Sequence, residues 1–155
     1  MLKTIKTKTT RADGCSFAIV ASKYNSRYVD AMLRAAKAEL ERSKASVRIV
    51  RVPGAFEIPV VAARLAHSSV EWSGIICLGV ILRGATTHAQ HIGEAVSDAL
   101  MQIQTQYGVP VIHEVLLLEN EDQARARCQG KTHNRGTEAA QTALAMASIM
   151  KSLPE

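Results

Sequence analysis

Residues 75–88 read Ile75-Ile-Cys-Leu-Gly-Val-Ile-Leu-Arg-Gly-Ala-Thr-Thr-His88. The first part, 75–82, is too uniformly apolar for a strand with one solvent-exposed face. Such runs are typical of a strand in a parallel sheet that is buried on both faces. Arg83 and Gly84 interrupt the run. From His88 onward, apolar residues recur at helical spacing, which predicts a helix to about Tyr107. This stretch therefore predicts a buried strand, a short turn and a helix in succession.

The turn Gly84-Ala85-Thr86-Thr87 places His88 at the predicted start of a helix. Helix N-termini carry free amide donors and a positive dipole end, both of which favour an anion. Ligands bind at the carboxyl ends of the strands in open α/β sheets. The residues thus predict a site for a phosphate-sized anion beside a proton-transfer group. The alternative is that the threonines only cap the helix and that His88 is a surface residue.

The rest of the chain alternates strand and helix patterns, which predicts an α/β fold with a four-stranded parallel sheet. Further strands are expected at 17–21, 47–52 and 110–118, and further helices at 26–42, 59–66, 121–127 and 137–153. Ser26 is the expected N-cap of the first helix, and Gly108 the C-terminal cap of the helix from His88. The strand at 47–52 has alternating polar residues and is expected near an edge. Residues 1–13 are expected to form a flexible basic tail, and 14–155 a single domain.

The charge of the 155-residue chain is concentrated at its start. Four of the 19 basic residues precede the first acidic residue, Asp13, and the remaining 15 almost balance the 14 acidic ones. A nucleic-acid partner is therefore not expected from a net charge of +5. No apolar run approaches the roughly 20 residues of a membrane span, and the N-terminus lacks the apolar region of a secretory signal. Three widely spaced cysteines, with no paired metal-binding motif, favour a reducing compartment, so the expected location is cytoplasmic.

Two other predicted loops end at the same side of the sheet as the turn at 84–87. The first contains Tyr24-Asn25, and the second is Val52-Pro-Gly-Ala-Phe-Glu-Ile-Pro59. Each alone is compatible with an ordinary surface turn, with Glu57 as a favourable charge at a helix start. Together, an aromatic ring, exposed backbone, a carboxylate and a histidine at one edge favour a ligand site.

Two motifs carry a resemblance to a known family. They are Val52-Pro-Gly-Ala-Phe-Glu-Ile-Pro59 and Leu78-Gly-Val-Ile-Leu-Arg-Gly-Ala-Thr-Thr-His88. At this spacing and in this order of strands and helices, the chain closely resembles the 6,7-dimethyl-8-ribityllumazine synthases, which catalyse the penultimate step of riboflavin biosynthesis. The resemblance extends from about residue 17 to residue 153. It implies a three-layer flavodoxin-like sandwich, with helices on both faces of the sheet.

The resemblance implies a condensation that needs no cofactor and no metal. The amine of 5-amino-6-(D-ribitylamino)uracil attacks the ketone of 3,4-dihydroxy-2-butanone 4-phosphate, phosphate leaves, and ring closure with loss of water gives the lumazine. His88 is the implied catalytic residue, since an imidazole near neutrality can move protons. The implied phosphate-binding residues are Ala85, Thr86 and Arg127, with Lys131 as a further candidate. The implied aminouracil-binding residues are Tyr24, Asn25, Ala55, Phe56, Glu57, Val80, Ile81, Leu82 and His113.

The resemblance also implies a site shared between subunits, in which a neighbour supplies His113 and the segment 127–131. The expected partners are the two small-molecule substrates and further copies of the chain in a homopentamer. The sequence is compatible with a free pentamer and with an icosahedral assembly of pentamers, and with riboflavin synthase as a further partner. No nucleic acid and no membrane are expected.

Several features depart from the usual pattern of the family. The stretch Val115-Leu-Leu-Leu118 replaces a threonine-rich strand end. His113 stands where an aromatic residue is usual, and Arg135 where a lysine is common. Gln90 replaces an aspartate, which removes a carboxylate that could orient His88. Gln90 and His113 favour one alternative to the enzyme, a catalytically slow paralogue that binds a lumazine or flavin. A second alternative is a structural cage protein.

Overall fold

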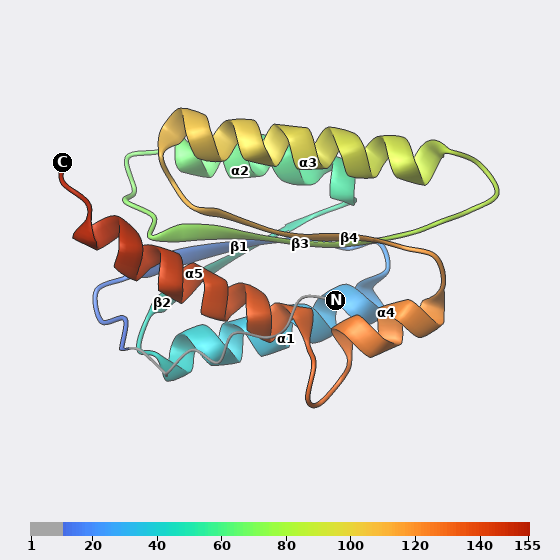
Figure 1. Cartoon of the computed structure of the whole chain (residues 1–155), viewed down its shortest axis with the longest axis horizontal. Coiled ribbons are helices and arrows are strands. Elements are labelled where there is room, and N and C mark those ends of the chain that lie inside the picture. The colour runs from blue at the N-terminus through green and yellow to red at the C-terminus, as the bar shows by residue number, and fades with distance from the viewer. Residues whose placement is uncertain (1–10) are drawn as a thin grey trace.

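Four parallel strands form one sheet at the centre of the molecule (Figure 1). The computed structural model describes residues 11–155. The strands are β1 (Ser16–Ser22), β2 (Ser46–Val52), β3 (Gly74–Leu82) and β4 (Val111–Leu118), in the order β2-β1-β3-β4. Because all pairs are parallel, the four carboxyl ends lie at one side of the sheet, which we call the rim.

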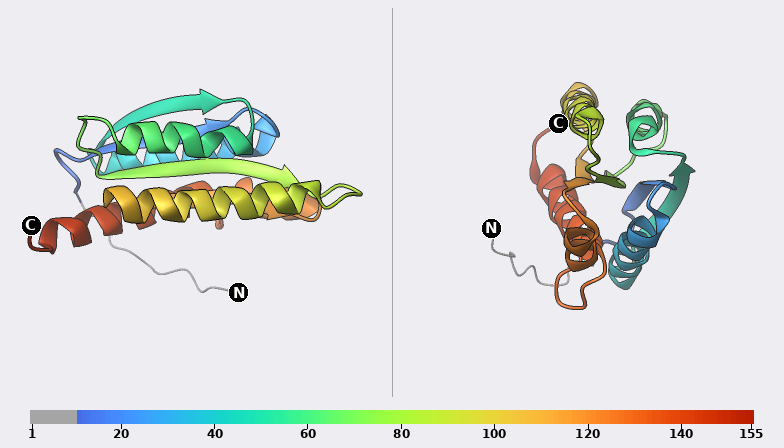
Figure 2. Two further views of the ribbon diagram at one scale, coloured as in Figure 1. Left: turned by 90° about the horizontal axis from the view of Figure 1, so that it is seen from above. Right: turned by 90° about the vertical axis from the view of Figure 1, so that its right-hand side faces the viewer.

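Helices cover both faces of this sheet and complete three layers (Figures 1 and 2). One face carries α1 (Ser26–Arg42), α4 (Glu121–Cys128) and α5 (Arg135–Ser152). The other carries α2 (Ile58–Ala66) and α3 (His88–Tyr107), and a short 3-10 helix, η1 (Ala55–Glu57), precedes α2. The predicted flavodoxin-like sandwich is therefore confirmed.

β3 is buried on both faces, as its apolar run predicts. Ile76 and Leu78 belong to the core under α1 and α5, whereas Ile75 and Cys77 belong to the core under α2 and α3. Burial raises the pKa of the Cys77 thiol to about 12, so Cys77 is a core residue and not a nucleophile. The prediction of an edge strand at 47–52 is also confirmed, because β2 is the first strand of the sheet.

The prediction that Ser26 caps the first helix is wrong. The N-cap of α1 is Asn25, and Ser26 is the first helical residue. Asn25 has a left-handed backbone, with φ 56° and ψ 37°, a conformation that asparagine tolerates better than most residues. Gly108, with φ 64°, caps the C-terminus of α3 as predicted.

The stripe of small residues in the last helix packs inside the chain. Ala139, Ala140, Ala143 and Ala147 are buried in the same core as Met32 and Ala36 of α1. Gly136 lies so close to α1 that a Cβ there would overlap the carbonyl oxygen of Met32. The small side chains thus allow a tight crossing of α1 and α5, and this stripe gives no evidence for packing between subunits.

The predicted N-terminal tail falls mostly outside the described residues, which begin at Arg11. Ala12 is buried, and its amide donates to the Ser43 carbonyl at 2.7 Å, so the chain is attached to the domain from that point. Within residues 11–155, no helix combines the length and apolar character of a membrane span.

Candidate active site

The loops that follow β1, β2 and β3 meet at the rim. The side-chain amide of Asn25 donates to the Val80 carbonyl at 2.7 Å, which joins the first loop to the end of β3. The backbone amides of Lys23 and Tyr24 each donate to the Pro53 carbonyl at 3.0 Å, which joins the first loop to the second. The first two loops and the end of β3 are therefore joined to one another, and the turn 84–87 continues from β3 at the same side of the sheet.

Gly54 separates the ring of Tyr24 from the carboxylate of Glu57. A Cβ at Gly54 would lie 2.8 Å from a ring carbon of Tyr24 and 2.9 Å from Oε2 of Glu57. Only glycine lets both side chains approach the backbone at this point. The amide of Gly54 donates to the same Oε2 at 2.9 Å, which fixes the exposed carboxylate at the start of η1.

Two large aromatic rings at the rim are exposed to solvent. Tyr24 is 70% exposed and Phe56 is 63% exposed, an unusual state for rings of this size. Ala55, within the second loop, is buried. The side chains of Val80 and Ile81 are buried as well, so a ligand at the end of β3 would meet the backbone and not these side chains. The rim thus combines flat apolar surface with backbone polar groups, as a site for a planar polar molecule requires.

The start of α3 lies beyond an exposed turn, 84–87. Its N-cap is Thr87, which makes no side-chain capping bond to the helix as far as the described chain shows, and the first turn holds no acidic residue. The nearest substitute is a long contact of 3.4 Å from the His88 amide to Thr86 Oγ1. The uncapped start retains its preference for an anion, with the exposed imidazole of His88 beside it.

The side chain of Gln90 is bonded to Arg83 and Glu94. Its oxygen accepts from Arg83 Nη2 at 3.2 Å, and its nitrogen donates to Glu94 Oε1 at 2.9 Å. Arg83 also donates to Glu119 Oε1 at 3.0 Å. Sequence reasoning considered residue 90 only for a direct effect on His88, and it missed this group of contacts.

His113 lies within β4, opposite Cys77, and not at the end of the strand. Nδ1 accepts from the Val115 amide at 3.1 Å, and Nε2 lies 2.7 Å from Ser97 Oγ on α3. Because Nδ1 is an acceptor, the ring proton belongs on Nε2, which donates to Ser97. Burial lowers the pKa of His113, which favours this neutral form.

Glu114 is a buried acid that sequence reasoning did not select. Its residue is 7% exposed, and Oε2 accepts from Arg135 Nε at 3.0 Å. Arg135 Nη1 donates to Glu138 Oε2 at 2.9 Å, so the two carboxylates share one guanidinium. Burial raises the pKa of Glu114 to about 7, against the opposing effect of Arg135. The sequence feature that could have pointed to Glu114 is an acidic residue inside an otherwise apolar strand.

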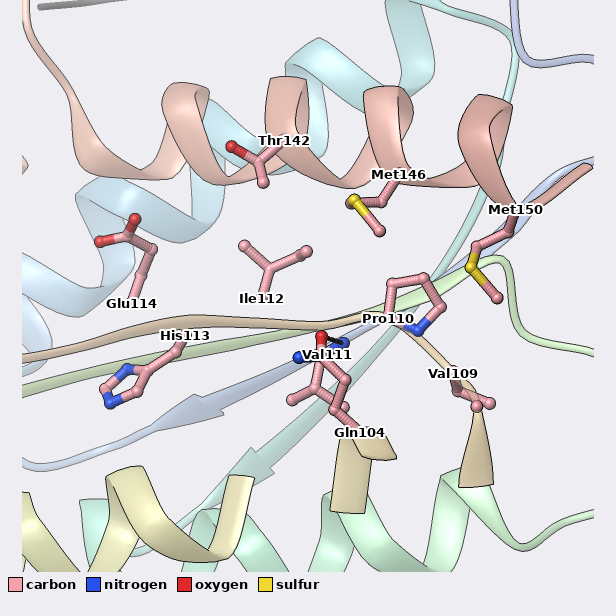
Figure 3. Close-up of a pocket in the computed structure, with 11 residues that line it drawn as sticks. Gln104, Val109, Pro110, Val111, Ile112, His113, Glu114, Thr142, Met146 and Met150 are labelled. Atoms are coloured by element: carbon pink, nitrogen blue, oxygen red, sulfur yellow. Dashed lines mark hydrogen bonds between the residues drawn. The ribbon is translucent and has the colours of Figure 1, made fainter. Parts of the chain in front are cut away.

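An open groove of about 430 Å³ runs along the free side of β4, between α3 and α5 (Figure 3). We call it the edge groove. His113 and Glu114 lie at one end of it and point to opposite faces of the sheet (Figure 3). The residues that line the groove are Gln104, Gly108, Val109, Pro110, Val111, Ile112, His113, Glu114, Thr142, Met146 and Met150. This groove is a second surface, separate from the rim loops that hold Tyr24, Glu57 and His88.

Arg127 and Lys131 lie on the α1, α4 and α5 side of the sheet. Arg127 is exposed in the last turn of α4, and Lys131 is exposed in the loop that follows. Figure 1 shows α4 on the face opposite α3, whose first residue is His88. A single chain therefore gathers the candidate residues of the three rim loops but does not place Arg127, Lys131 or His113 among them.

Comparison with known proteins decides the family. Residues 14–151 match the family described as 6,7-dimethyl-8-ribityllumazine synthase. The chain belongs to this family. It is 39% identical over 145 residues to the 6,7-dimethyl-8-ribityllumazine synthase of Stenotrophomonas maltophilia (strain R551-3), covering 92% of this chain and 93% of that protein. It is 40% identical over 141 residues to the protein of the same name from Xanthomonas oryzae pv. oryzae (strain PXO99A), covering 89% and 91%.

The resemblance found in the two sequence motifs is thus confirmed for nearly the whole chain. The range that matches the lumazine synthase family includes the rim loops and also His113, Arg127 and Lys131. A member of this family therefore holds both groups of candidate residues on one chain, at different places on its surface.

Proposed function

We propose that this chain is a 6,7-dimethyl-8-ribityllumazine synthase. It condenses 5-amino-6-(D-ribitylamino)uracil with 3,4-dihydroxy-2-butanone 4-phosphate to give 6,7-dimethyl-8-ribityllumazine, phosphate and water. The observation that carries this proposal is the family match over residues 14–151. The geometry of the rim supports it, because each part of the two substrates has a chemically suitable counterpart there.

The aminouracil binds at the first two rim loops. The exposed rings of Tyr24 and Phe56 provide surfaces on which a pyrimidine can stack. The Glu57 carboxylate accepts hydrogen bonds from ribityl hydroxyls. The rest of the aminouracil-binding part of the site consists of Asn25, Ala55 and the backbone of 80–82. Holding the amine against the ketone of the second substrate is a proximity task, which is worth several orders of magnitude in rate.

The phosphate substrate binds at the start of α3. Ala85 and Thr86 precede the uncapped helix and present amides and a hydroxyl to the phosphate, and Arg127 supplies a cation. His88 moves protons while the amine attacks, the imine forms and phosphate leaves. Binding the phosphate at a positive helix end also stabilises the charge of the departing group.

A second subunit completes the site. His113, Arg127 and Lys131 lie away from the rim loops of their own chain, so in this proposal they act in the site of a neighbour, with Lys131 as an additional phosphate contact. We propose a homopentamer of the single domain 14–155, with a larger assembly of pentamers as an extension of the same contacts. The proposed location is the cytoplasm, where riboflavin synthase is the chemically expected consumer of the product.

The test is to mix the two substrates with the purified full chain and follow the absorbance of the lumazine. We expect product from the wild type, a kcat at least about 100-fold lower in His88→Ala, and mainly a higher KM for the phosphate substrate in Arg127→Ala. His91→Ala, in the same turn of α3, and Arg125→Ala, in the same helix as Arg127, are the matched controls. Absence of product from the correctly assembled wild type would refute the proposed enzyme.

A further inference from the structure

We propose that Arg83 and Gln90 are positioning residues, whose contact closes the turn 84–87 and holds His88 at the rim. This inference rests on the proposed function, because it concerns the same reaction. It assigns no contact with substrate to either residue. Their effect on catalysis passes through the placement of the first turn of α3.

Arg83 is fixed to the sheet at its backbone. Its amide donates to the Leu118 carbonyl at 2.8 Å, which places it at the joined ends of β3 and β4. Its guanidinium then makes two contacts in different directions. Nη1 donates to Glu119 Oε1 at 3.0 Å, and Nη2 donates to Gln90 Oε1 at 3.2 Å.

The contact with Gln90 spans the turn that leads to His88. Residues 84–87 are all exposed, and Gln90 lies two residues beyond His88 in the first turn of α3. The helix start has no side-chain cap of its own among the described residues, and Thr86 offers only the 3.4 Å contact. The bond between Arg83 and Gln90 therefore adds a polar attachment of this helix start to the sheet end, beside the buried side chain of Ala89.

Glu94 sets the orientation of the Gln90 amide. The nitrogen of Gln90 donates to Glu94 Oε1 at 2.9 Å, so the oxygen is the atom that faces Arg83. Four groups thus form one chain of contacts, from Glu119 through Arg83 and Gln90 to Glu94. An amide suits the middle of this chain because it accepts from a guanidinium on one side and donates to a carboxylate on the other.

These contacts are partly exposed and contribute little to global stability. The side chain of Arg83 is 39% exposed and that of Glu119 is 55% exposed, and ion pairs of this kind add little to folding free energy. Reaction rates are more sensitive, since a small misplacement of a catalytic group costs far more than a lost surface contact. The signature of positioning is therefore a kinetic loss without a loss of stability.

The test compares Arg83→Met, Gln90→Leu and the double variant in the full assembled chain, with Lys37→Gln as the control. Lys37 is an exposed cation paired with Glu41 on α1, away from the rim. With the aminouracil saturating, we expect each single change to lower kcat about fivefold, with little change in unfolding midpoint. The losses should not multiply in the double variant, because both changes break the same contact between Arg83 and Gln90, whereas each also removes one outer contact, with Glu119 or with Glu94.

Gln90→Glu keeps an acceptor for Arg83 but loses the donor to Glu94, so it tests the contact with Arg83 alone and should retain kcat within about twofold. Unchanged kcat in both single variants, or losses that multiply in the double variant, would overturn the proposal. Amide hydrogen exchange of residues 86–91 gives a readout that does not depend on turnover. Faster exchange there in Arg83→Met supports positioning even if the wild type makes no product, a result that would refute only the proposed function.

Discussion

Replacement of Glu114 by glutamine should change how the stability of the protein depends on pH. The carboxyl group is buried, and burial raises its pKa from an ordinary 4.5 to about 7. The folded protein therefore binds more protons than the unfolded chain between these two values. Stability from this group is fully present below pH 4.5 and is lost as the pH rises through 7. The difference between the two pKa values corresponds to ~3 kcal/mol of folding free energy.

Urea unfolding between pH 5 and pH 8, at one fixed protein concentration, measures this effect. From pH 5 to pH 8, we expect the free energy of unfolding of Glu114→Gln to rise relative to that of the wild type by about 2 to 3 kcal/mol, because glutamine cannot ionise. Arg135 keeps its ion pair with Glu138 in the variant, so the guanidinium retains a carboxylate partner.

Glu138→Gln is the matched control, since it removes a carboxylate from the same arginine at a more exposed position. Its side chain is 27% exposed, against 10% for Glu114. Parallel pH profiles for the wild type and Glu114→Gln would refute the reasoning. A variant that loses stability relative to the wild type at high pH would also refute it, because attraction to Arg135 would then outweigh the burial of the charge.

Three further predictions concern single residues. Because burial lowers the pKa of His113, this group stabilises the folded protein above its ordinary pKa of 6.5, and that stabilisation is lost as the pH falls. In His113→Gln, the free energy of unfolding in urea should therefore fall less between pH 7 and pH 5 than in the wild type. Gly136→Ala should lower the free energy of unfolding, measured in urea, by about 3 kcal/mol, because the new Cβ would overlap the backbone of Met32. The control is Gly93→Ala, whose Cβ would have its nearest neighbour atom at 3.7 Å and which should be neutral or stabilise by up to about 1 kcal/mol. Equal effects of the two changes would contradict this. Asn25→Gly keeps the left-handed backbone but loses the bond to the end of β3, and should cost about 1 kcal/mol of unfolding free energy; a variant as stable as the wild type would count against that bond.

The fold was predictable because its signals are local and repeated. The apolar run from Ile75 and the helical spacing after His88 predict β3 and α3, and the structure places them at Gly74–Leu82 and His88–Tyr107. The error at Ser26 has a physical reason. A serine before an apolar stripe is a good cap on average, but the backbone at Asn25 turns into the helix one residue earlier.

The candidate site was predictable only where chain topology determines it. Parallel strands bring their carboxyl ends together, so the three rim loops could be grouped without knowledge of any contact. The pair of Glu114 and Arg135 joins residues 21 apart in the sequence, and the bond from Arg83 to Gln90 spans seven. No periodic pattern encodes which side chains meet across an element boundary, so these contacts required coordinates.

The separation of the two groups of candidate residues also constrains how copies of the chain can assemble. In the proposed enzyme, one site takes the rim loops from one subunit and His113 and Arg127 from another. The contact between subunits then joins two different surfaces, not one surface to itself. Such heterologous contacts generate rings when the rotation closes, whereas a two-fold dimer pairs identical surfaces. A closed ring such as the proposed pentamer therefore gives every rim a partner, while an isolated chain leaves its rim without these residues and the free side of β4 uncovered.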